Sequence, residues 1–415
     1  MLPQVETPIK NLEEYKEIIS QELFEEISGL AKPLKNLKII MVNSTPRGGG
    51  VAEVLKSLIP LMKGVGLRAE WYTIPPREDF FKITKEIHNA LQGKEYTLPF
   101  WHRVKYLQHI ETSARLMRDM KADIWVIHDP QPAGVILYLP RFHSSICRLH
   151  IDLTSPNQET WNFFAGIFGM YDKIILSSKE YIKKEIKEKT VVFPPAIDPL
   201  MPKNQPLDLT VAKEILENYG INTSRPLISQ VSRFDPSKGF PEVIEAYFSA
   251  KKKITDLQLA LVGFFLARDD PEAMKVYKLI RKKSEKDSDI FLFSDPDMLG
   301  SLKVDDFVNA VQTASDVVLQ NSIKEGFGLS VAEALWKGKA VIGNKAGGIK
   351  LQIENGKNGF LVSNSKELAK RIVQLIKNLG LREKLGVAAK ETVKEKFLMP
   401  RLLRDYLKLF KELLL

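Results

Sequence analysis

Two glutamates eight positions apart, Glu325 and Glu333, lie within a glycine-containing stretch, Ser322-Ile-Lys-Glu-Gly-Phe-Gly-Leu-Ser-Val-Ala-Glu-Ala-Leu-Trp336. A buried-strand pattern precedes this stretch and a helical pattern ends it, which predicts a strand, a glycine turn and a helix N-terminus. Gly326 and Gly328 lack a Cβ, so the backbone can approach a ligand closely. The N–H groups of the first helical turn suit a phosphate, whereas the Glu325 carboxylate suits sugar hydroxyls. The stretch therefore indicates a ligand that is both a phosphate and a sugar, and an ordinary strand-to-helix turn is the alternative.

Two cations follow an earlier predicted strand, in Ser229-Gln-Val-Ser-Arg-Phe-Asp-Pro-Ser-Lys-Gly-Phe240. The strand, Pro226 to Ser232, ends beside Arg233, and a loop with Lys238 leads into a helix. Ligands of open α/β sheets bind at this end of the strands. An Arg fork and a Lys point charge can together neutralise a pyrophosphate without a metal. The alternative, for either residue taken alone, is that it is a solvated cation in a loop.

The first half of the chain has chemistry-capable groups at three predicted strand ends. Asn43-Ser-Thr-Pro-Arg-Gly-Gly-Gly50 follows one strand, and its glycines could let backbone amides reach a phosphate or a sugar. It is not a dinucleotide fingerprint. The other two ends are His128-Asp129 and His150-Ile-Asp152. A histidine at the end of a strand is more often structural than catalytic. Asp152 is a candidate to accept hydrogen bonds from a second sugar.

The two donor-side motifs carry a family resemblance. Ser-Arg-Phe-Asp-Pro-Ser-Lys-Gly, followed about ninety residues later by a Glu-x7-Glu pair, resembles the large retaining glycosyltransferase family of GT-B fold that includes sucrose and glycogen synthases. The stretch Arg148-Leu-His-Ile-Asp-Leu-Thr-Ser-Pro-Asn157 resembles the trehalose glycosyltransferring synthases of thermophilic archaea and bacteria. The resemblance covers the chain from about Leu37 to its end. It implies two Rossmann-like, doubly wound α/β domains with parallel sheets facing a cleft, and a C-terminal helix crossing back to the first domain.

The resemblance also implies roles for individual residues. Arg233 and Lys238 would hold the donor diphosphate, Glu325 would bind the hexose, and Glu333 would take both ribose hydroxyls. His150 would lie near the donor hexose, and the first glycine loop would face the cleft. The candidate catalytic residues are Arg233, Lys238, Glu325 and His150. The candidate substrate-binding residues are Gly49, Gly50, Asp152, Gly326, Phe327, Gly328, Leu329 and Glu333.

The reaction implied by the resemblance is the transfer of glucose, with retention, from UDP-glucose, ADP-glucose or GDP-glucose to free glucose, giving trehalose. Another acceptor, with a sucrose-like or other glucoside product, and a non-catalytic nucleotide-sugar-binding protein are the alternatives. We expect no required cofactor and no metal site, with Mg²⁺ at most a non-essential activator. Asp269-Asp270 is interpreted as a solvated loop or helix start.

Composition limits the other classes of function. The 415 residues are 44% hydrophobic and 27% charged, which is globular, and the length predicts two or three domains. The net charge is +10, but the cationic residues are dispersed along the sequence and no nucleic-acid-binding motif accompanies them. A surface that attracts anionic sugar nucleotides explains the positive charge as well. No apolar run of membrane-spanning length and no signal layout is found. We expect a cytoplasmic protein from a heat-adapted source, with Cys147 buried, no nucleic-acid or membrane partner, and a homodimer as one possible state.

The elements that must position these groups follow α/β alternation. Asn11 to Leu30 is predicted as a helix outside the first sheet, and Pro194 to Pro202 as the linker. The tail from Pro400 has an apolar stripe of Leu403, Leu407, Phe410 and Leu414. The predicted strands are Leu37–Val42, Arg68–Ile74, Asp123–His128, Ile146–His150, Lys173–Ser177, Thr190–Phe193, Leu227–Val231, Leu257–Val262, Ile290–Phe293, Val317–Leu319, Ala340–Ile342 and Phe360–Val362.

The predicted domains are an acceptor-side domain at residues 1–198, a nucleotide-sugar-binding domain at residues 199–398, and a helix at residues 399–415 that packs on the first.

Overall fold

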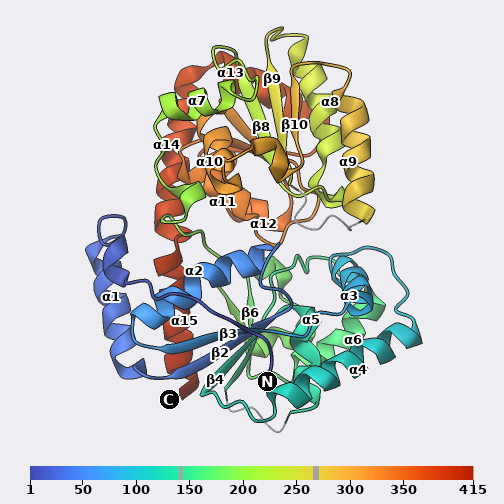
Figure 1. The fold of residues 1–415 in the computed structure, drawn as a ribbon, viewed down its shortest axis with the longest axis vertical. Coiled ribbons are helices and arrows are strands. Elements are labelled where there is room, and N and C mark those ends of the chain that lie inside the picture. The colour runs from blue at the N-terminus through green and yellow to red at the C-terminus, as the bar shows by residue number, and fades with distance from the viewer. Residues whose placement is uncertain (140–143, 265–270, 415) are drawn as a thin grey trace. The chain divides into compact units, whose positions relative to one another are not determined.

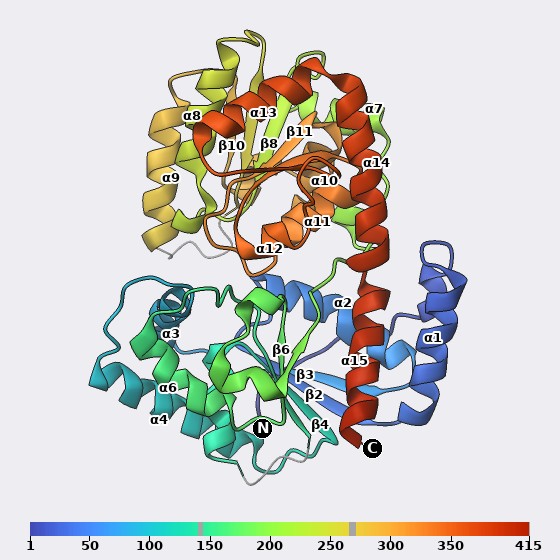
Figure 2. The ribbon, with the colours of Figure 1, turned by 180° about the vertical axis from the view of Figure 1, so that it is seen from behind.

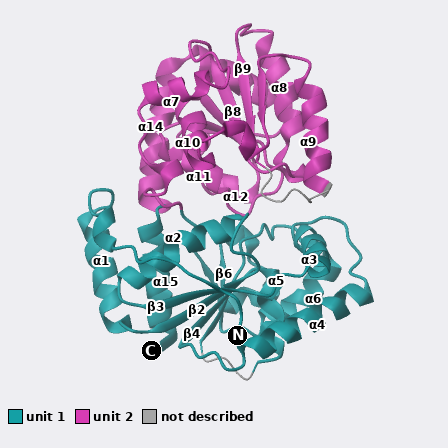
Figure 3. Ribbon diagram, in the orientation of Figure 1, with its two compact units in different colours: residues 1–196, 398–415 teal, residues 197–397 magenta. Residues whose placement is uncertain are grey.

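A computed structural model describes residues 1–139, 144–264 and 271–414. The chain forms two compact units, one of Met1–Ala196 with Leu398–Leu415 and the other of Ile197–Phe397 (Figure 3). Each unit is built on a single sheet covered by helices (Figure 1). The predicted architecture of two parallel-sheet α/β domains is therefore confirmed.

Unit 1 contains a seven-stranded sheet in the order β1-β3-β2-β4-β5-β6-β7. All neighbours pair in parallel except β1, which runs antiparallel to β3 at the edge and pairs Gln4 with Tyr72. The strands are β1 (Gln4–Val5), β2 (Lys38–Asn43), β3 (Arg68–Thr73), β4 (Ile124–His128), β5 (Ser145–Arg148), β6 (Lys173–Leu176) and β7 (Thr190–Val192). The α-helices are α1 (Gln21–Ala31), α2 (Gly50–Gly64), α3 (Glu78–Leu91), α4 (Phe100–Met117), α5 (Pro130–Ala133), α6 (Gln158–Phe168) and α15 (Met399–Leu414). Short 3₁₀ turns are η1 (Leu12–Tyr15), η2 (Lys32–Leu34), η3 (Gly134–Leu137), η4 (Lys179–Tyr181) and η5 (Lys184–Lys189).

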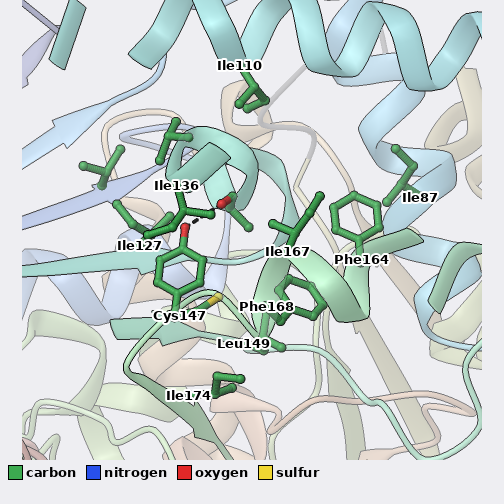
Figure 4. Close-up of a cluster of buried hydrophobic side chains, with 14 of the residues drawn as sticks. Ile87, Ile110, Ile127, Ile136, Cys147, Leu149, Phe164, Ile167, Phe168 and Ile174 are labelled. Carbon is green, nitrogen blue, oxygen red and sulfur yellow. Dashed lines mark hydrogen bonds between the residues drawn. The ribbon is translucent and has the colours of Figure 1, made fainter. Parts of the chain in front are cut away.

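Alternate residues of the unit 1 strands face opposite sides of the sheet. On one side, Ile127, Cys147 and Leu149 pack with Phe164 and Phe168 of α6 (Figure 4). Cys147 is fully buried there, as predicted. This core fixes the carboxyl ends of β4 and β5, which carry the histidines singled out in the sequence.

The two ends of the chain meet in unit 1. The single helix predicted for Asn11 to Leu30 is wrong: a 3₁₀ turn ends near Tyr15, and α1 starts only after Ser20, whose hydroxyl caps the amide of Leu23. The C-terminal α15 packs against α1 and α2 (Figure 2). The predicted stripe of α15 is buried as far as Phe410, but Leu414 is 45% exposed.

Unit 2 contains a six-stranded parallel sheet in the order β10-β9-β8-β11-β12-β13. The strands are β8 (Leu227–Val231), β9 (Gln258–Val262), β10 (Ile290–Phe293), β11 (Val317–Gln320), β12 (Ala340–Asn344) and β13 (Phe360–Val362). The α-helices are α7 (Leu209–Glu217), α8 (Phe240–Lys251), α9 (Pro271–Ser284), α10 (Val304–Ala314), α11 (Leu329–Trp336), α12 (Gly347–Lys350), α13 (Ser365–Lys377) and α14 (Leu379–Lys396). The 3₁₀ turns are η6 (Pro202–Asn204), η7 (Pro236–Lys238) and η8 (Pro296–Leu299). Strands β8 and β11 are direct neighbours, so the loops that follow them lie side by side.

None of the described helices is long and apolar enough to cross a membrane. The described ranges also contain no cluster of His, Cys, Asp and Glu side chains that could hold a metal ion. Asp269 and Asp270, interpreted from the sequence as a solvated loop or helix start, lie outside the described residues.

Candidate functional site

The loop after β8 is built around Asp235. Its carboxylate caps η7 by accepting hydrogen bonds from the amide of Ser237 at 2.9 Å and from its hydroxyl at 2.6 Å. Burial alone would raise the pKa of Asp235, but these hydrogen bonds and the charges of Arg233 and Lys238 bring it below its ordinary value. Both cations of the sequence motif therefore act on a single carboxylate.

Gly239 ties this loop to the end of β11. It adopts φ +61°, and a Cβ there would lie 2.3 Å from the carbonyl oxygen of Asn321. The Asn321 side chain in turn donates to the Gly239 carbonyl at 3.2 Å, and the Gln230 amide donates to the carbonyl of Lys238 at 2.9 Å. Only glycine fits this close approach, so Gly239 fixes the backbone position from which the Lys238 side chain extends.

Lys238 and Glu325 form a direct contact between the two loops. The Lys238 Nζ lies 2.6 Å from Glu325 Oε2, and the side chains are 13% and 14% exposed. The hydroxyl of Ser322 also donates to Glu325 Oε2, at 3.1 Å. The structure thus brings together two residues that are 87 positions apart in the sequence.

Arg233 has a different environment. Its side chain is exposed, and within the described ranges it has no hydrogen bond or ion pair. The charge of Arg233 nevertheless reaches Asp235, because it contributes to the lowered pKa of that carboxylate. Arg233 is therefore an exposed cation whose charge, like that of Lys238, acts on Asp235.

The glycine turn after β11 is held by a second glycine-rich turn. Gly328, at φ +87°, caps α11, and a Cβ on Gly348 of α12 would lie 2.4 Å from the backbone nitrogen of Phe327. The Gln352 amide donates to the carbonyl of Phe327 at 2.5 Å and to that of Gly328 at 3.2 Å. Gly326 and Phe327 are buried in this packing, whereas Gly328 and Leu329 are half-buried at the start of α11.

The second glutamate of the motif, Glu333, is buried in α11 at 3% exposure. Its Oε1 lies 2.6 Å from Nζ of Lys203 in η6. This contact is a buried ion pair between α11 and η6. Glu333 is therefore not a surface side chain, although it lies in a helix.

The first glycine loop in unit 1 has open space around it. Gly49 precedes α2 at φ −157°, and a Cβ at Gly48 or Gly49 would meet no atom within 4 Å. Gly50 is the first residue of α2. The loop starts from Asn43, whose side chain accepts from the Trp71 indole at 2.8 Å and donates to the carbonyl of Thr45 at 2.7 Å.

The carboxyl ends of β4 and β5 join in a polar cluster in which His128 and Asp129 are buried and His150 is half-buried. His128 Nδ1 and His150 Nε2 are 3.0 Å apart, and Asp129 Oδ1 accepts from the backbone N–H of His150 at 2.7 Å. Burial, together with the charge of Arg148, lowers the pKa of His128 to about 3 and lowers that of His150. Burial raises the pKa of Asp129 to about 7. Both imidazoles are therefore neutral at physiological pH.

Asp152 is 2% exposed and serves the turn after β5. Its Oδ1 accepts hydrogen bonds from the amide of Thr154 at 2.9 Å and from the hydroxyl of the same residue. One oxygen of the candidate acceptor-binding carboxylate is therefore used within the chain.

The sequence reasoning did not identify several residues that shape these sites. Lys203, Asn321 and Ser322 contact the predicted residues from distant or neighbouring segments. The Gly347-Gly348 pair after β12 repeats the strand-then-glycine pattern that marked the other loops, and that signal could have found it.

Two family models match the chain. Residues 41–183 match the model "Trehalose synthase, N-terminal domain", and residues 211–392 match "Glycosyl transferases group 1". The chain is 42% identical over 402 residues to a trehalose synthase of Thermococcus litoralis, covering 96% of each protein. It is 39% identical over 420 residues to a trehalose synthase of Rubrobacter xylanophilus, covering 100% of each.

A solved structure shows the same fold. Sucrose-phosphate synthase from Thermosynechococcus elongatus is similar with a TM-score of 0.72 at 15% sequence identity, covering 91% of this chain and 99% of that one. The fold implied by the sequence motifs is thereby confirmed.

Proposed function

This chain belongs to the trehalose synthase family, and on that basis we propose that it transfers glucose, with retention, from a nucleoside-diphosphate glucose to free glucose. The product is α,α-trehalose. That the chain is a glycosyltransferase of trehalose metabolism follows from the family, whereas the donor, the acceptor and the retention of configuration are our proposal.

The observation that carries the proposal is the contact of Lys238 with Glu325, in a loop where Arg233 and Lys238 both act on Asp235. The cations and the carboxylate follow adjacent parallel strands, where open α/β sheets bind ligands. The cations suit a diphosphate and the carboxylate suits hydroxyls, so this combination fits a sugar diphosphate.

Arg233 and Lys238 stabilise the leaving diphosphate in this proposal. Negative charge grows on the diphosphate as its bond to the sugar breaks, and one well-placed donor lowers such a barrier by ~3–4 kcal/mol. The backbone amides of Gly328 and Leu329, at the start of α11, add partial positive charge. Glu325 accepts hydrogen bonds from the glucose hydroxyls, with the amides of Gly326 and Phe327 beside it.

Transfer proceeds on one face of the sugar. The bond between the anomeric carbon and the diphosphate oxygen breaks, the acceptor hydroxyl oxygen bonds to the same carbon, and its proton passes to the departing oxygen. Glu325 is not the nucleophile in this proposal, because the glucose hydroxyls occupy its carboxylate. A trapped glucosyl-enzyme would contradict this mechanism.

Unit 1 supplies the acceptor-side residues in this proposal. Gly49 and Gly50 bring backbone amides to the substrates, neutral His150 contacts the donor hexose, and Asp152 binds acceptor hydroxyls. The two cations take the place of a metal, so we expect activity to survive a chelator. Complete loss of activity in chelator, with recovery in Mg²⁺, would assign the charge-neutralising role to the metal.

The direct test is to supply ¹³C-glucose-labelled UDP-glucose, ADP-glucose and GDP-glucose, each with and without free glucose, and to identify the product by NMR. We expect trehalose only when glucose is present, with the α configuration at both anomeric carbons. A glucoside of another acceptor would show a related transferase. Donor binding with no turnover on any acceptor would indicate a nucleotide-sugar-binding protein.

A further inference from the structure

The carboxylate of Glu333 is buried and forms an ion pair with Lys203. Its side chain is 4% exposed, and Lys203 Nζ lies 2.6 Å from Oε1. One ammonium occupies only part of the acceptor capacity of a carboxylate, so lone pairs remain for a ligand that brings hydroxyl groups.

The position of Lys203 is fixed by its backbone. The Asn309 side chain of α10 donates to the carbonyls of Pro202 and Gln205, each at 3.0 Å. The indole of Trp336 in α11 donates to the carbonyl of Asn204, also at 3.0 Å. Lys203 thus belongs to a segment anchored on both sides to the helices of unit 2, and its side chain is only 13% exposed.

A second lysine lies near Glu333 without forming an ion pair with it. The Lys337 ammonium donates to Gln312 Oε1 at 2.9 Å, and to the backbone carbonyl of Glu333 at 3.5 Å. Burial lowers the pKa of Lys337 to about 8, the charge of Glu333 acts in the opposite direction, and that of Lys203 lowers it further. Lys203 is therefore the cation in contact with the carboxylate, and Lys337 is a buried neighbour that can serve as a control.

We propose that Lys203 is a positioning residue that holds the Glu333 carboxylate in place, so that it accepts both ribose hydroxyls of the donor nucleotide. This inference rests on the proposed function, because it concerns the same nucleotide site. A vicinal diol presents two O–H donors that one ionised carboxylate can accept on its two oxygens. A buried carboxylate is unfavourable unless a cation pairs with it, and Lys203 supplies that cation for Glu333.

The opposite role for Lys203 is competition with the ligand, in which its ammonium occupies the position that the ribose needs. The two roles predict opposite effects of removing the charge. A positioning lysine strengthens ribose binding, whereas a competing lysine weakens it.

The test measures binding of UDP, ADP and GDP and of their 2′-deoxy and 3′-deoxy counterparts by calorimetry. Using the base that binds, we expect wild type to prefer the ribonucleotide by about 10- to 100-fold, the range for hydrogen bonds to a charged group. Lys203→Met should lose this preference by weakening ribonucleotide binding only, Lys203→Arg should restore part of it, and Lys337→Met should keep it. A merely structural defect would weaken the ribo- and deoxyribonucleotides alike.

The double variant Lys203→Met/Glu333→Gln tests whether Lys203 acts through Glu333. If Lys203 acts through Glu333, the double variant should show no less preference than either single variant, which is non-additive behaviour. Retention of the ribose preference in Lys203→Met, or tighter ribonucleotide binding, would overturn the inference while leaving the proposed function intact. Wild-type protein that binds none of the diphosphates would overturn the proposed function itself.

Discussion

The ammonium of Lys238 and the carboxylate of Glu325 form an ion pair 2.6 Å long, although each is proposed to bind a different part of the same donor. Both side chains are largely buried, so folding removes most of their hydration. In the proposed reaction, donor binding would exchange partners: the diphosphate would take the lysine and the sugar hydroxyls would take the glutamate. The proposed groups for both parts of the donor are thus in direct contact with each other.

Lys238→Met should lower kcat by about 10²- to 10³-fold, because a charge that stabilises the leaving diphosphate is lost. Lys238→Arg should recover part of the activity. Initial rates and circular dichroism separate loss of turnover from loss of fold. The matched control is Arg225→Met, which breaks the 2.6 Å contact with Asp289 while Lys251 still pairs with that carboxylate. Unchanged kcat in Lys238→Met would contradict the phosphate role.

Arg233→Met should reduce kcat/KM by a similar factor of about 10²- to 10³-fold without changing stability. The side chain is exposed and has no partner within the described ranges, so its removal should leave the free energy of unfolding within about 0.5 kcal/mol. Urea unfolding and steady-state kinetics on the same preparations check both parts. A large loss of stability would mean that Arg233 supports the fold rather than the substrate.

Much of the fold could be predicted because buried parallel strands are continuous apolar runs. Strands β8, β10 and β13 have the predicted bounds. The cations and glutamates were found because they follow such strands directly. The contact of Lys238 with Glu325 also follows from topology, since β8 and β11 are neighbours in the sheet.

Other features depend on contacts that sequence spacing does not reveal. Lys203 lies in a proline-containing segment 130 positions before Glu333, and only the folded chain brings them together. The burial of Glu333 has the same origin, because a lone glutamate in a helical pattern normally predicts a surface position. The break between Tyr15 and Ser20 was missed because apolar residues continue at near-helical spacing across it.

Gly49→Ala and Gly348→Ala should differ in their effect on stability. A Cβ at Gly49 meets no atom within 4 Å, so this variant should keep wild-type stability and lose activity only if a substrate approaches the loop closely. A Cβ at Gly348 would lie 2.4 Å from the backbone of Phe327, so this variant should disturb the glycine turn and lower stability, donor affinity and kcat. Melting temperatures and kinetics distinguish them. Full activity in Gly49→Ala would contradict a direct role of that loop.

The buried cluster of unit 1 should make the protein less stable in acid. Burial, with the charge of Arg148, lowers the pKa of His128 to about 3 and lowers that of His150, whereas an unfolded histidine has a pKa of about 6.5. Below about pH 6.5 the unfolded chain therefore binds more protons than the folded chain, and the free energy of unfolding falls as the pH falls. Asp129 acts in the opposite direction, because burial raises its pKa to about 7 and the folded chain holds a proton that an unfolded carboxylate releases near pH 3.9.

Asp129→Asn should consequently make the free energy of unfolding fall more steeply as the pH is lowered from about 6.5 to 4.5. The slope should increase by up to roughly 1.4 kcal/mol per pH unit, the value for one proton. The substitution suits the site, since Asn tolerates the φ of +68° and keeps an oxygen for the backbone N–H of His150. Urea unfolding at several pH values measures the slope directly. His128→Gln, which removes one of the opposing groups, should make the slope shallower instead. Equal slopes in wild type and Asp129→Asn would show that Asp129 is already ionised in the folded chain.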